Sequence, residues 1–580
     1  EKSEGRPACK HAPSQRAEMQ PGQTMQAGGM NVSLVSVAQD ENGRPLIVLR
    51  DEGAKKRTRG IEAHRASIVA ATAMASILSS SFGPKGMDKL MVSQDRDVLI
   101  TNDGATILRN MDVSNHIAKL MVELSECQDN EVGDGTTGVV ILAGALLEHS
   151  EALLTKGIHP IRVSDGYDEA CRIAVSYLEK YAEHADFTLL NRDMLMKAAK
   201  TSLYSKIVNR DHDTMASIAV DAVLAVADIE RRDVDFDNIK VMASAGGTLD
   251  DTHIVHGIVL DKDISHSNMA REVKNAKIAL LTVAFEPPKL KTKYSLEIDS
   301  PEKYKELYAA EQEYFIEQVE MVKKSGANVV FCQWGFDDEA NHLLMKAGIP
   351  AVRWVSATDL EAIAIATGGS IVGRFEDLSP EKLGSCGVIR EVSTGTMADR
   401  HIEVLDCPHS QVVTVVVKAS NDMAAMEAER SLHDAICVVR NLVSDPRIVY
   451  GGGACEVGAS LAILRDAETE SGPRSLALRA FSDALDSIPL ALARNCGLHP
   501  VETLSGVKAA QEKAYRAQEA GEEVAVPSHQ IGVDCFNTGS SDMKELHVFE
   551  TLNSKVQQFL LATQMTRMVL KIDEVLEDAV

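Results

Sequence analysis

Hydrophobic and polar positions first divide the chain into long helical stretches. In HIAKLMVELSECQDN, apolar residues recur with the spacing i, i+3, i+4 and i+7 from Ile117 to Leu124, which predicts an amphipathic helix. The segment GVVILAGALL, residues 138–147, is apolar on every side and predicts a fully buried helix. Between the two lies EVGDGTTG, whose glycines interrupt both patterns.

The pattern changes near residues 245–251, where short apolar runs begin to alternate with amphipathic segments. ANVVFCQWG predicts a strand, DDEANHLLMKAG a helix that ends at Gly348, and IPAVRWV another strand. We therefore expect a small α/β domain in the middle of the chain. Within it, residues 286–322 start rich in proline and lysine and continue as a charged helix, which predicts an excursion from the domain surface.

Long helical patterns return after residues 411–420, as in NDMAAMEAERSLHDAICVVRNLV. A helical region is thus interrupted by an α/β domain and then resumes. We expect the two distant segments to fold together, with the middle domain inserted through glycine-bearing joints that can act as hinges.

Composition adds limits to this picture. At roughly 150 residues per domain, 580 residues suggest about three to four domains. Aromatic residues make up only 4% of the chain, so the cores must be aliphatic, and the net charge of −25 argues against general binding to nucleic acid or anionic lipid.

None of the ten cysteines forms a C-x-x-C pair, which is typical of reduced thiols in a cytosolic protein. Residues 1–30 predict a disordered extension without a secretory signal, and the longest apolar segment, Val139 to Leu147, is too short to span a membrane.

The loop GDGTTG matches the dinucleotide fingerprint G-x-G-x-x-G, but a helix precedes it where that fingerprint requires a strand. What remains is a glycine-rich turn before a helix N-terminus, where free N–H groups and the helix dipole favour an anion. Thr136 and Thr137 add hydroxyl donors, while Asp134 would repel a bare phosphate but suits Mg²⁺. A metal–nucleotide complex explains the loop. A glycine-rich helix cap with Asp134 at the N-cap explains it equally well.

Other candidate residues also have simple structural explanations. Asp103 in TNDG fits an ordinary Asp-Gly turn, and the glycines at 451–453 allow either close approach to a ligand or a loose linker. Asp434 follows Arg430 by four residues on a predicted helix, so a surface ion pair is the favoured interpretation. His253 and His256 form a lone H-x-x-H that fits exposed strand histidines better than a metal site.

The motifs GPKGMDK, TNDGATIL, GDGTTG and GGGACE occur in this order, and together they resemble the group II chaperonins. These are the ATP-driven folding machines of archaea and of the eukaryotic cytosol, and the resemblance covers nearly everything after residue 31. RRDVDF, FEPPKLKTK, CQWGFDDEANHLL and LATQMTRMVLKIDE resemble in particular one subunit type of the eukaryotic ring.

The resemblance implies an α/β multidomain fold. Its parts would be a mainly helical equatorial ATPase domain from both chain ends (31–175 and 434–580), a small hinge-like intermediate domain (176–245 and 395–433), and an inserted α/β apical domain (246–394) with a helical lid protrusion near 286–322.

The resemblance also implies roles for individual residues around ATP. Asp134 would be the Mg²⁺ ligand, Asp103 would assist at the γ-phosphate, and Asp434 would position and polarise the attacking water. The residues implied to contact the nucleotide are Gly83 beside it, Gly135, Thr136 and Thr137 on the phosphates, Ser205 and Lys206 approaching the phosphates, and Gly452, Asp534, Glu550 and Lys555 against the sugar or base.

The implied function is ATP hydrolysis coupled to protein folding in a cytoplasmic, hetero-oligomeric double ring. Its partners would be paralogous ring subunits and unfolded clients such as cytoskeletal proteins, with no nucleic acid and no membrane. The alternatives are a dehydrogenase that uses GDGTTG as its dinucleotide loop, and a ring subunit that binds nucleotide without hydrolysing it. Three features depart from the pattern of the family that the chain resembles. Phe82 replaces the family's usual leucine before Gly-Pro, Tyr204 stands where small residues are common in the family, and the segment 505–534 between the last helices is longer than the resemblance predicts.

Overall fold

The computed structural model describes residues 57–576 with short gaps, together with four strand segments nearer the N-terminus. The gaps are residues 94–95, 97, 185–191, 288–297, 299, 394–399, 409–411, 522–523, 537 and 540, and the strand segments are 26–27, 30–31, 33–39 and 45–50. The disordered extension predicted for residues 1–30 lies almost entirely outside the described residues. The chain divides into two compact units, one of residues 65–571 and one that joins residues 1–64 to residues 572–580.

In the smaller unit, a strand near the start of the chain pairs with one near its end. β5 (Arg57–Arg59) runs antiparallel to β21 (Glu574–Leu576). Nε of Arg59 lies 2.7 Å from the Glu574 carboxylate. The other strands of this unit form two hairpins, β1 (Gln26–Ala27) with β2 (Met30–Asn31) and β3 (Ser33–Gln39) with β4 (Pro45–Arg50).

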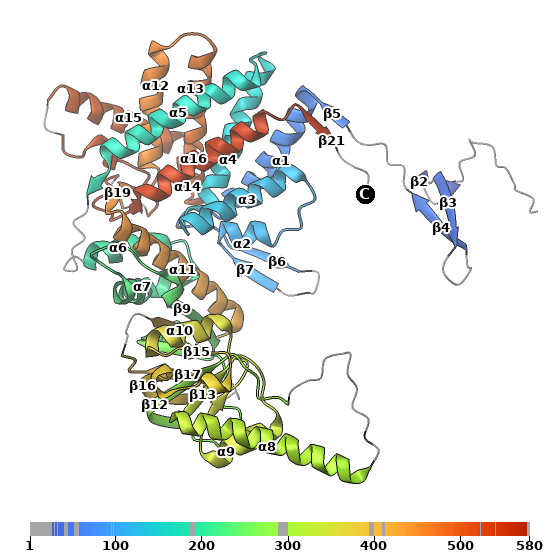
Figure 1. Cartoon of the computed structure of the whole chain (residues 1–580). Coiled ribbons are helices and arrows are strands. Elements are labelled where there is room, and N and C mark those ends of the chain that lie inside the picture. Colours follow the sequence, from blue (N-terminus) through green and yellow to red (C-terminus); the bar gives the residue numbers. More distant parts are fainter. Residues whose placement is uncertain are drawn as a thin grey trace, which may run out of the picture. The chain divides into compact units, whose positions relative to one another are not determined.

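Helices from the first and last parts of the chain lie side by side (Figure 1). α16 packs against α3, α4 and α5, and α13 packs against α4 and α5. The helices are α1 (Ile61–Ser79), α2 (Gly104–Arg109), α3 (His116–Glu131), α4 (Thr136–Thr155), α5 (Pro160–Tyr181), α12 (Ala454–Thr469), α13 (Pro473–Leu485), α14 (Ser487–Asn495), α15 (Pro500–Glu519) and α16 (Leu552–Leu570).

Helix α4 contains the apolar run at residues 138–147 and extends beyond it at both ends. Among the helices that the structure describes, it alone is long and apolar enough to cross a membrane, so the apolar segment is longer than the sequence pattern indicated. However, 72% of its most apolar stretch is buried within the protein. Its neighbours α3, α5, α13 and α16 cover it, so α4 is a core helix of this fold.

Two small sheets support loops of this helical region. β6 (Lys89–Val92) and β7 (Val98–Thr101) form a hairpin that leads into residues 102–103. β19 (Arg447–Tyr450) lies between β8 (Glu183–His184) and β20 (Phe549–Thr551). The ends of β7, β19 and β20 carry segments that the sequence singled out as candidate sites.

A second group of helices packs against a three-stranded sheet. The sheet has the order β10-β18-β9, and its strands are β9 (Ile239–Ala245), β10 (His253–Val255) and β18 (Val413–Ala419). β9 and β18 pair in parallel, although the whole α/β region separates them in sequence. Helix α11 (Asp422–Ser444) contacts both strands and also α6 (Arg192–Leu203) and α7 (His212–Val226). The chain thus enters the α/β region after β9 and leaves it before β18, and these two strands are neighbours in the sheet.

The α/β region contains a seven-stranded mixed sheet with helices on both faces. Along β12, Ile278 and Leu280 join the core beneath α10, while Ala279 and Leu281 join the core beneath α8 and α9. This alternation is the period-two pattern of a strand covered on both faces. The elements are β11 (Gly257–Leu260), β12 (Glu272–Leu281), β13 (Val329–Cys332), β14 (Ala351–Val352), β15 (Ile371–Val372), β16 (Gly384–Ser393), β17 (Arg400–Leu405), α8 (Pro301–Ser325), α9 (Asp338–Ala347) and α10 (Ala357–Thr367).

Helix α8 begins in the charged segment that predicted an excursion. Its buried residues lie only between Phe315 and Ser325, while residues 301–311 are exposed. The N-terminal half of α8 therefore extends beyond the sheet that its C-terminal half covers (Figure 1). Most of the Pro- and Lys-rich part of the predicted excursion, residues 288–297, lies outside the described residues.

The two tryptophans of the chain lie together on the surface of the α/β region. Trp334 and Trp354 are each about half exposed, and their ring centroids are 6.5 Å apart. Trp354 has a φ of +57°, which is a strained conformation for a bulky residue. A Cβ atom at Gly335 would lie 2.8 Å from the Trp354 ring, so this glycine makes room for the pair.

Candidate functional site

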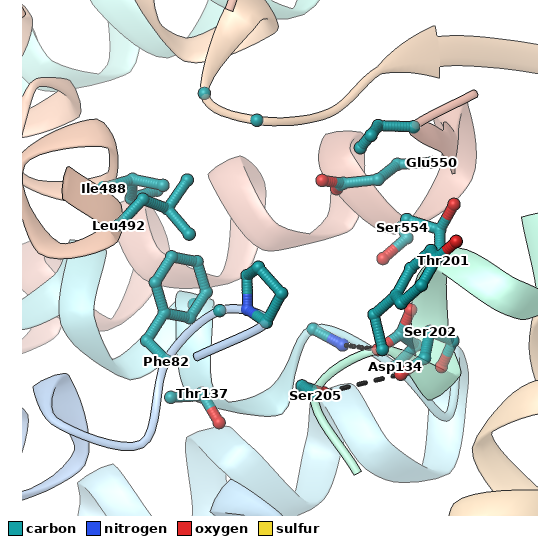
Figure 2. A pocket seen from close by; sticks show the side chains of 18 of the residues that line it. Phe82, Asp134, Thr137, Thr201, Ser202, Ser205, Ile488, Leu492, Glu550 and Ser554 are labelled. Carbon is teal, nitrogen blue, oxygen red and sulfur yellow. Dashed lines mark hydrogen bonds between the residues drawn. The ribbon is translucent and has the colours of Figure 1, made fainter. Parts of the chain in front are cut away.

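A cavity opens in the helical region where loops from distant parts of the chain meet (Figure 2). Asp434 of α11 and Lys555 of α16 also line it. The loops that contribute are residues 81–84, 102–103, 134–138, 204–206, 452–453, 548–551 and the loop of residues 533, 535 and 536.

The GDGTTG loop connects α3 directly to α4, so a helix precedes the glycines and the dinucleotide interpretation is excluded. Gly133 and Gly135 have φ of +76° and +79°, which favour glycine. Gly135 is itself the N-cap of α4 and makes no side-chain cap hydrogen bond. The alternative prediction of Asp134 as an N-cap residue is therefore wrong: Asp134 lies one position earlier, and its Oδ1 accepts a hydrogen bond from the Gly135 N–H at 2.7 Å.

The first turn of α4 faces the cavity, with Thr136 and Thr137 both in its wall. No side chain occupies the N-cap position, so backbone N–H groups at this helix end remain for a ligand. Together with the helix dipole, they make this end of α4 suitable for an anion. Burial raises the pKa of Asp134, although the Gly135 N–H and Lys206 oppose the rise.

Asp103 lies in an Asp-Gly turn, as one interpretation of the sequence predicted, and its side chain also contacts the GDGTTG loop. It is the N-cap of α2, and its carboxylate accepts hydrogen bonds from the Thr106 N–H at 3.0 Å and the Thr106 hydroxyl at 2.6 Å. Its other oxygen accepts from the Thr136 hydroxyl at 3.2 Å, which links two loops of the cavity. Burial opposes ionisation of Asp103, but Lys206 and these hydrogen bonds hold its pKa below the usual value.

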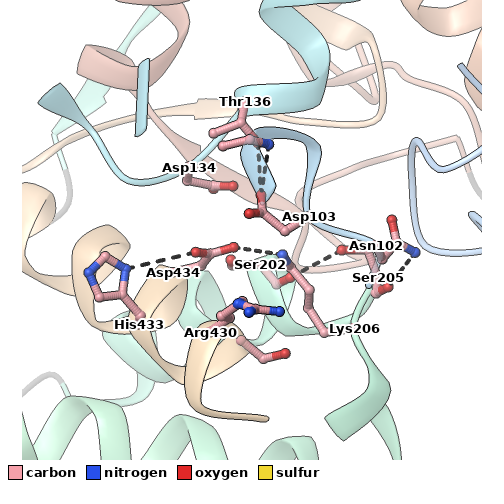
Figure 3. Close-up of polar contacts among 12 residues, drawn as sticks. Asn102, Asp103, Asp134, Thr136, Ser202, Ser205, Lys206, Arg430, His433 and Asp434 are labelled. Carbon is pink, nitrogen blue, oxygen red and sulfur yellow. Dashed lines mark hydrogen bonds and ion pairs between the residues drawn. The ribbon is translucent and has the colours of Figure 1, made fainter. Parts of the chain in front are cut away.

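Asp434 does not form the predicted surface ion pair with Arg430. Its carboxylate is buried and lies 2.7 Å from Nζ of Lys206 (Figure 3). Arg430 pairs with Glu427 instead. The prediction of a surface ion pair is wrong because two faces of α11 are in contact with other parts of the protein. One face packs on the aliphatic core around α6 and α7, and the face that carries Asp434 lines the cavity.

The cavity concentrates negative charge around one ammonium group. Burial raises the pKa of Asp434 although Lys206 opposes it, and Asp103 and Asp134 add to the rise. Burial disfavours the charged form of Lys206, but Asp434 and Asp103 outweigh it and raise the pKa of Lys206. Three carboxylates facing one lysine favour a further cation, and carboxylate oxygens are ligands that Mg²⁺ prefers. Within the described residues no preformed cluster of three His, Cys, Asp or Glu side chains could hold a metal ion, so a cation here would need oxygens from a ligand or from water as well.

The loop that carries Lys206 is held by the TNDG turn. Asn102 donates a hydrogen bond from Nδ2 to the Ser205 carbonyl at 3.1 Å, and the Ser205 hydroxyl donates to the Ser202 carbonyl at 3.4 Å. Both Ser205 and Lys206 line the cavity. Lys206 is thus placed by its own loop and by the turn that carries Asp103.

The glycines at 451–453 form an ordered turn, so the loose-linker interpretation is wrong. The Val533 N–H donates to the Gly452 carbonyl at 2.9 Å. Gly452 has a φ of +65°, and a Cβ atom there would lie 2.6 Å from Sδ of Met543. The backbone therefore passes close to the cavity in a conformation that suits glycine.

Glu550 and Lys555 lie together on the opposite wall. Nζ of Lys555 is 2.6 Å from Oε2 of Glu550 and 2.7 Å from Oε1 of Glu456. Glu456 is completely buried and also accepts a hydrogen bond from the Cys455 thiol. It ends the GGGACE motif, but the sequence pattern predicted no role for it, because a glutamate in a helix first turn is normally a surface residue that complements the dipole.

Two buried polar atoms in the cavity wall have no hydrogen-bond partner within the described part of the chain, Ser202 Oγ and Gln558 Nε2. Leaving such a group unpaired costs about 1–3 kcal/mol. Together with the open end of α4 and the three carboxylates, they fit a large polar ligand that carries phosphates and a cation.

Comparison with known proteins identifies the family. Residues 74–579 match the TCP-1/cpn60 chaperonin family. The chain belongs to this family. T-complex protein 1 subunit epsilon of Encephalitozoon cuniculi is 47% identical over 540 residues, which cover 93% of this chain and 98% of that protein. Thermosome subunit alpha of Thermoplasma acidophilum is 39% identical over 534 residues, and thermosome subunit beta of Aeropyrum pernix is 40% identical over 539 residues; each match covers 92% of this chain and 94% of the relative.

The resemblance to the group II chaperonins is thereby confirmed, including the particular similarity to the epsilon subunit of the eukaryotic ring. The chain is a subunit of an ATP-dependent chaperonin whose ATPase activity is coupled to protein folding. The mixed helical and strand content agrees with the chaperonin fold. The alternative of a dehydrogenase is wrong, because the chain belongs to the chaperonin family and because a helix, not a strand, precedes the GDGTTG loop.

The chaperonin cavity gathers almost every residue that the resemblance singled out, with one exception. Gly83 lines it, with a φ of +87° beside Leu492. Asp534 does not line it: its carboxylate accepts hydrogen bonds from the Phe536 and Gly539 N–H groups at 3.0 and 2.9 Å and thus orders its own loop. The neighbouring Cys535 faces the cavity instead. The sequence also missed Asn102, Ser202, Glu456, Phe536 and Gln558 as cavity residues.

His253 and His256 both lie exposed near the strand β10. The His253 side chain is exposed and its Nδ1 lies 2.9 Å from the Asp251 carbonyl oxygen, which fits the interpretation as a strand histidine.

Proposed function

We propose that the cavity binds ATP together with Mg²⁺ and hydrolyses its terminal phosphate. The convergence of Asp103, Asp134 and Asp434 on the open end of α4, with Lys206 among them, carries this proposal. Phosphoryl transfer needs phosphate positioning, cationic stabilisation and a group that orients the nucleophile, and these residues supply each of them.

Mg²⁺, when bound, would neutralise phosphate charge and orient the phosphate oxygens. Asp134 offers it a carboxylate oxygen next to the α4 N-terminus. The first-turn N–H groups of α4 and the hydroxyls of Thr136 and Thr137 hold the phosphates, with Gly135 allowing the close approach.

Asp434 positions and polarises the attacking water, because a carboxylate with a raised pKa can accept a proton at neutral pH. Asp103 assists beside the γ-phosphate while it holds the Thr136 hydroxyl. Ser205 and Lys206 approach the phosphates from the loop after α6, so that Lys206 exchanges its contact with Asp434 for one with phosphate.

The sugar and base lie against the opposite wall. Gly83 and Gly452 give close backbone approach, and Glu550 with Lys555 presents a paired carboxylate and ammonium. Asp534 acts here through the loop that it orders, which carries Val533 and Cys535 into the cavity wall.

We further propose the chaperonin domain division for this chain. Residues 31–175 and 434–580 would form the equatorial domain, residues 176–245 and 395–433 the intermediate domain, and residues 246–394 the apical domain with its protrusion near 286–322. The parallel pairing of β9 with β18 and the exposed N-terminal half of α8 support this division. Because Asp434 and Lys206 come from elements beside the joint, domain closure would couple hydrolysis to lid movement.

The partners we propose are paralogous subunits in a hetero-oligomeric double ring and unfolded client proteins such as cytoskeletal proteins, in the cytoplasm. The similarity to a T-complex protein 1 subunit and to thermosome subunits supports the ring partners. The net charge of −25 disfavours nucleic acid and anionic membranes as partners.

The test uses the assembled ring that contains this chain, carrying Asp434→Ala. We expect photolabelling of this chain by 8-azido-ATP to be retained, while phosphate release by the ring falls by this subunit's share. Asp422→Asn, at the exposed start of the same helix, is the matched control and should change neither quantity. Unchanged phosphate release in Asp434→Ala would remove the proposed role.

A further inference from the structure

The C-terminal end of α14 joins two walls of the nucleotide cavity. Asn495, its last residue, donates hydrogen bonds from Nδ2 to the carbonyls of Ser79 and Phe82 at 2.8 and 2.7 Å. The next residue, Cys496, packs against the apolar cluster that contains Val533 and Cys535. Movement at this helix end therefore reaches both the loop before Gly83 and the loop at 533–536.

Two free thiols meet at this junction. Cys535 belongs to a buried apolar cluster, Cys496 packs against the same cluster from its partly exposed side, and both thiols are free. Cys535 is 7% exposed and lines the cavity, whereas Cys496 is half-buried and lies outside the cavity wall. An oxidant in solvent can thus reach Cys496, and the second thiol lies in the apolar cluster against which Cys496 packs.

The two thiols have different reactivity. Interaction with the Cys535 thiol, aided by the positive charge of Lys85, lowers the pKa of Cys496 to about 7. The same contact, together with burial, raises the pKa of Cys535. Cys496 is therefore partly thiolate at neutral pH, and thiolates are the species that oxidants attack.

We propose that Cys496 and Cys535 form a reversible disulfide in response to peroxides and that this bond weakens nucleotide binding in the adjacent cavity. The second half of this inference rests on the proposed function of that cavity. Cytosolic disulfides, where they occur, are mostly transient and redox-sensing, which fits this pair.

The chemistry balances with one peroxide. The Cys496 thiolate attacks the O–O bond of hydrogen peroxide, which forms an S–O bond and releases hydroxide. The Cys535 sulfur, losing its proton, then attacks the sulfenic sulfur, so that an S–S bond forms, the S–O bond breaks and water leaves. Two thiols are oxidised by two electrons in total, and the peroxide is reduced to two water molecules.

The bond would alter the cavity because disulfide geometry is narrow. The two sulfur atoms must come to about 2.05 Å, closer than in any hydrogen-bonded contact. The loop at 533–536 must follow, and it carries Val533 and Phe536 in the cavity wall. Phe536 also contacts the ring of Tyr204, at 5.5 Å between centroids, in the loop of Ser205 and Lys206. The displacement therefore reaches both the base side and the phosphate side.

A second thiol pair in the chain serves as an internal control. Cys386 belongs to a buried apolar cluster of the α/β region and Cys407 packs against it, but burial raises the pKa of Cys386 to about 12 and that of Cys407 to about 11. Both remain thiols at neutral pH, so at the same peroxide dose this pair should stay reduced.

The experiment treats the assembled ring with graded hydrogen peroxide, blocks free thiols, and analyses this chain by mass spectrometry after digestion without reductant. We expect a Cys496–Cys535 linked peptide at doses that leave Cys386 and Cys407 reduced, and its loss on treatment with dithiothreitol. In parallel, 8-azido-ATP labelling of this chain should fall about threefold or more and recover with dithiothreitol, since small displacements in such sites are costly.

Cys496→Ser provides the matched variant, because Cys496 lies outside the cavity wall. Its ring should label like the reduced wild type and resist peroxide. Absence of the linked peptide overturns the disulfide, and a linked peptide with unchanged labelling overturns its effect on binding. If the reduced wild-type chain is not labelled at all, the nucleotide site itself fails, while the linked peptide still decides the disulfide. If the Cys496→Ser variant does not assemble, recovery of labelling in the wild-type ring after dithiothreitol still tests whether the disulfide weakens binding.

Discussion

Nζ of Lys206 lies 2.7 Å from Oδ2 of Asp434, and the two side chains are only 8% and 12% exposed. This pair connects the loop after α6 to the middle of α11, two segments more than 200 residues apart in sequence. It also brings a positive charge within range of Asp103 and Asp134. Lys206 therefore offsets the carboxylates on this side of the cavity, whereas Lys555 pairs with those on the opposite wall.

Lys206→Met should destabilise the protein strongly. The substitution leaves Asp434 buried beside other carboxylates without its cation, and breaking a buried ion pair from one side costs about 3–5 kcal/mol in free energy of unfolding. Lys324→Met is the control, because its pair with Glu320 is longer, at 3.5 Å, and both side chains are exposed. We expect about 1 kcal/mol or less there. Urea unfolding of both variants measures the difference, and equal losses would contradict the prediction.

Asp134→Asn should stabilise the unliganded protein at neutral pH. The pKa of Asp134 is raised in the folded state, so its contribution to stability is full only below the unfolded pKa of about 3.9 and is lost as pH rises through the folded value. The gain in melting temperature for Asp134→Asn should therefore be present at pH 7.5 and shrink towards pH 4. Thermal unfolding across this range tests it, and a gain independent of pH would exclude linkage to this carboxyl group.

Lys555→Met should cost more stability than Glu456→Gln. Removal of Lys555 leaves Glu456 and Glu550 buried together without a cation, at about 3–5 kcal/mol, whereas removal of one carboxylate leaves Lys555 paired with the other. The double variant should be less destabilised than the sum of the single variants, because the residues interact directly. Urea unfolding of the three variants measures this coupling, and strict additivity would show that the triad does not act as a unit.

Gly452→Ala should weaken nucleotide binding and stability together. A Cβ atom there meets Met543 at 2.6 Å, and the positive φ adds about 1–2 kcal/mol of backbone strain. Gly348→Ala is the matched control: its φ of +71° is similar, but nothing lies within 4 Å of its added Cβ. Both variants should lose the strain energy in thermal unfolding, while only Gly452→Ala should lose 8-azido-ATP labelling. Equal labelling in the two would contradict the close approach at Gly452.

The sequence predicted local features well because they depend on neighbouring residues. The all-apolar run at 138–147 lies in the buried helix α4, and the glycines around Asp134 have the positive φ that a tight turn needs. The alternating segments after residue 251 form the strands and helices of the α/β region. These features follow from periodicity and from the conformational freedom of glycine, both of which can be read locally.

What the sequence could not predict depends on contacts between distant segments. Asp434 and Arg430 have the spacing of a helical surface pair, but the loop of Lys206 covers Asp434 from elsewhere in the chain. Glu456 has the position of an exposed helix-start acid, and only Lys555, 99 residues later, reveals that it is buried and paired. Asp534 lies between two residues of the cavity wall, yet its carboxylate accepts hydrogen bonds from N–H groups of its own loop and does not line the cavity.

The pairing of Trp334 with Trp354 decides what an optical experiment on this subunit can observe. The chain has only these two tryptophans, and neither lines the cavity that we propose for ATP. The intrinsic indole emission of this chain therefore reports the α/β region alone, whereas backbone circular dichroism averages over every helix. If the two signals change at different denaturant concentrations, the inserted region unfolds as a separate cooperative unit.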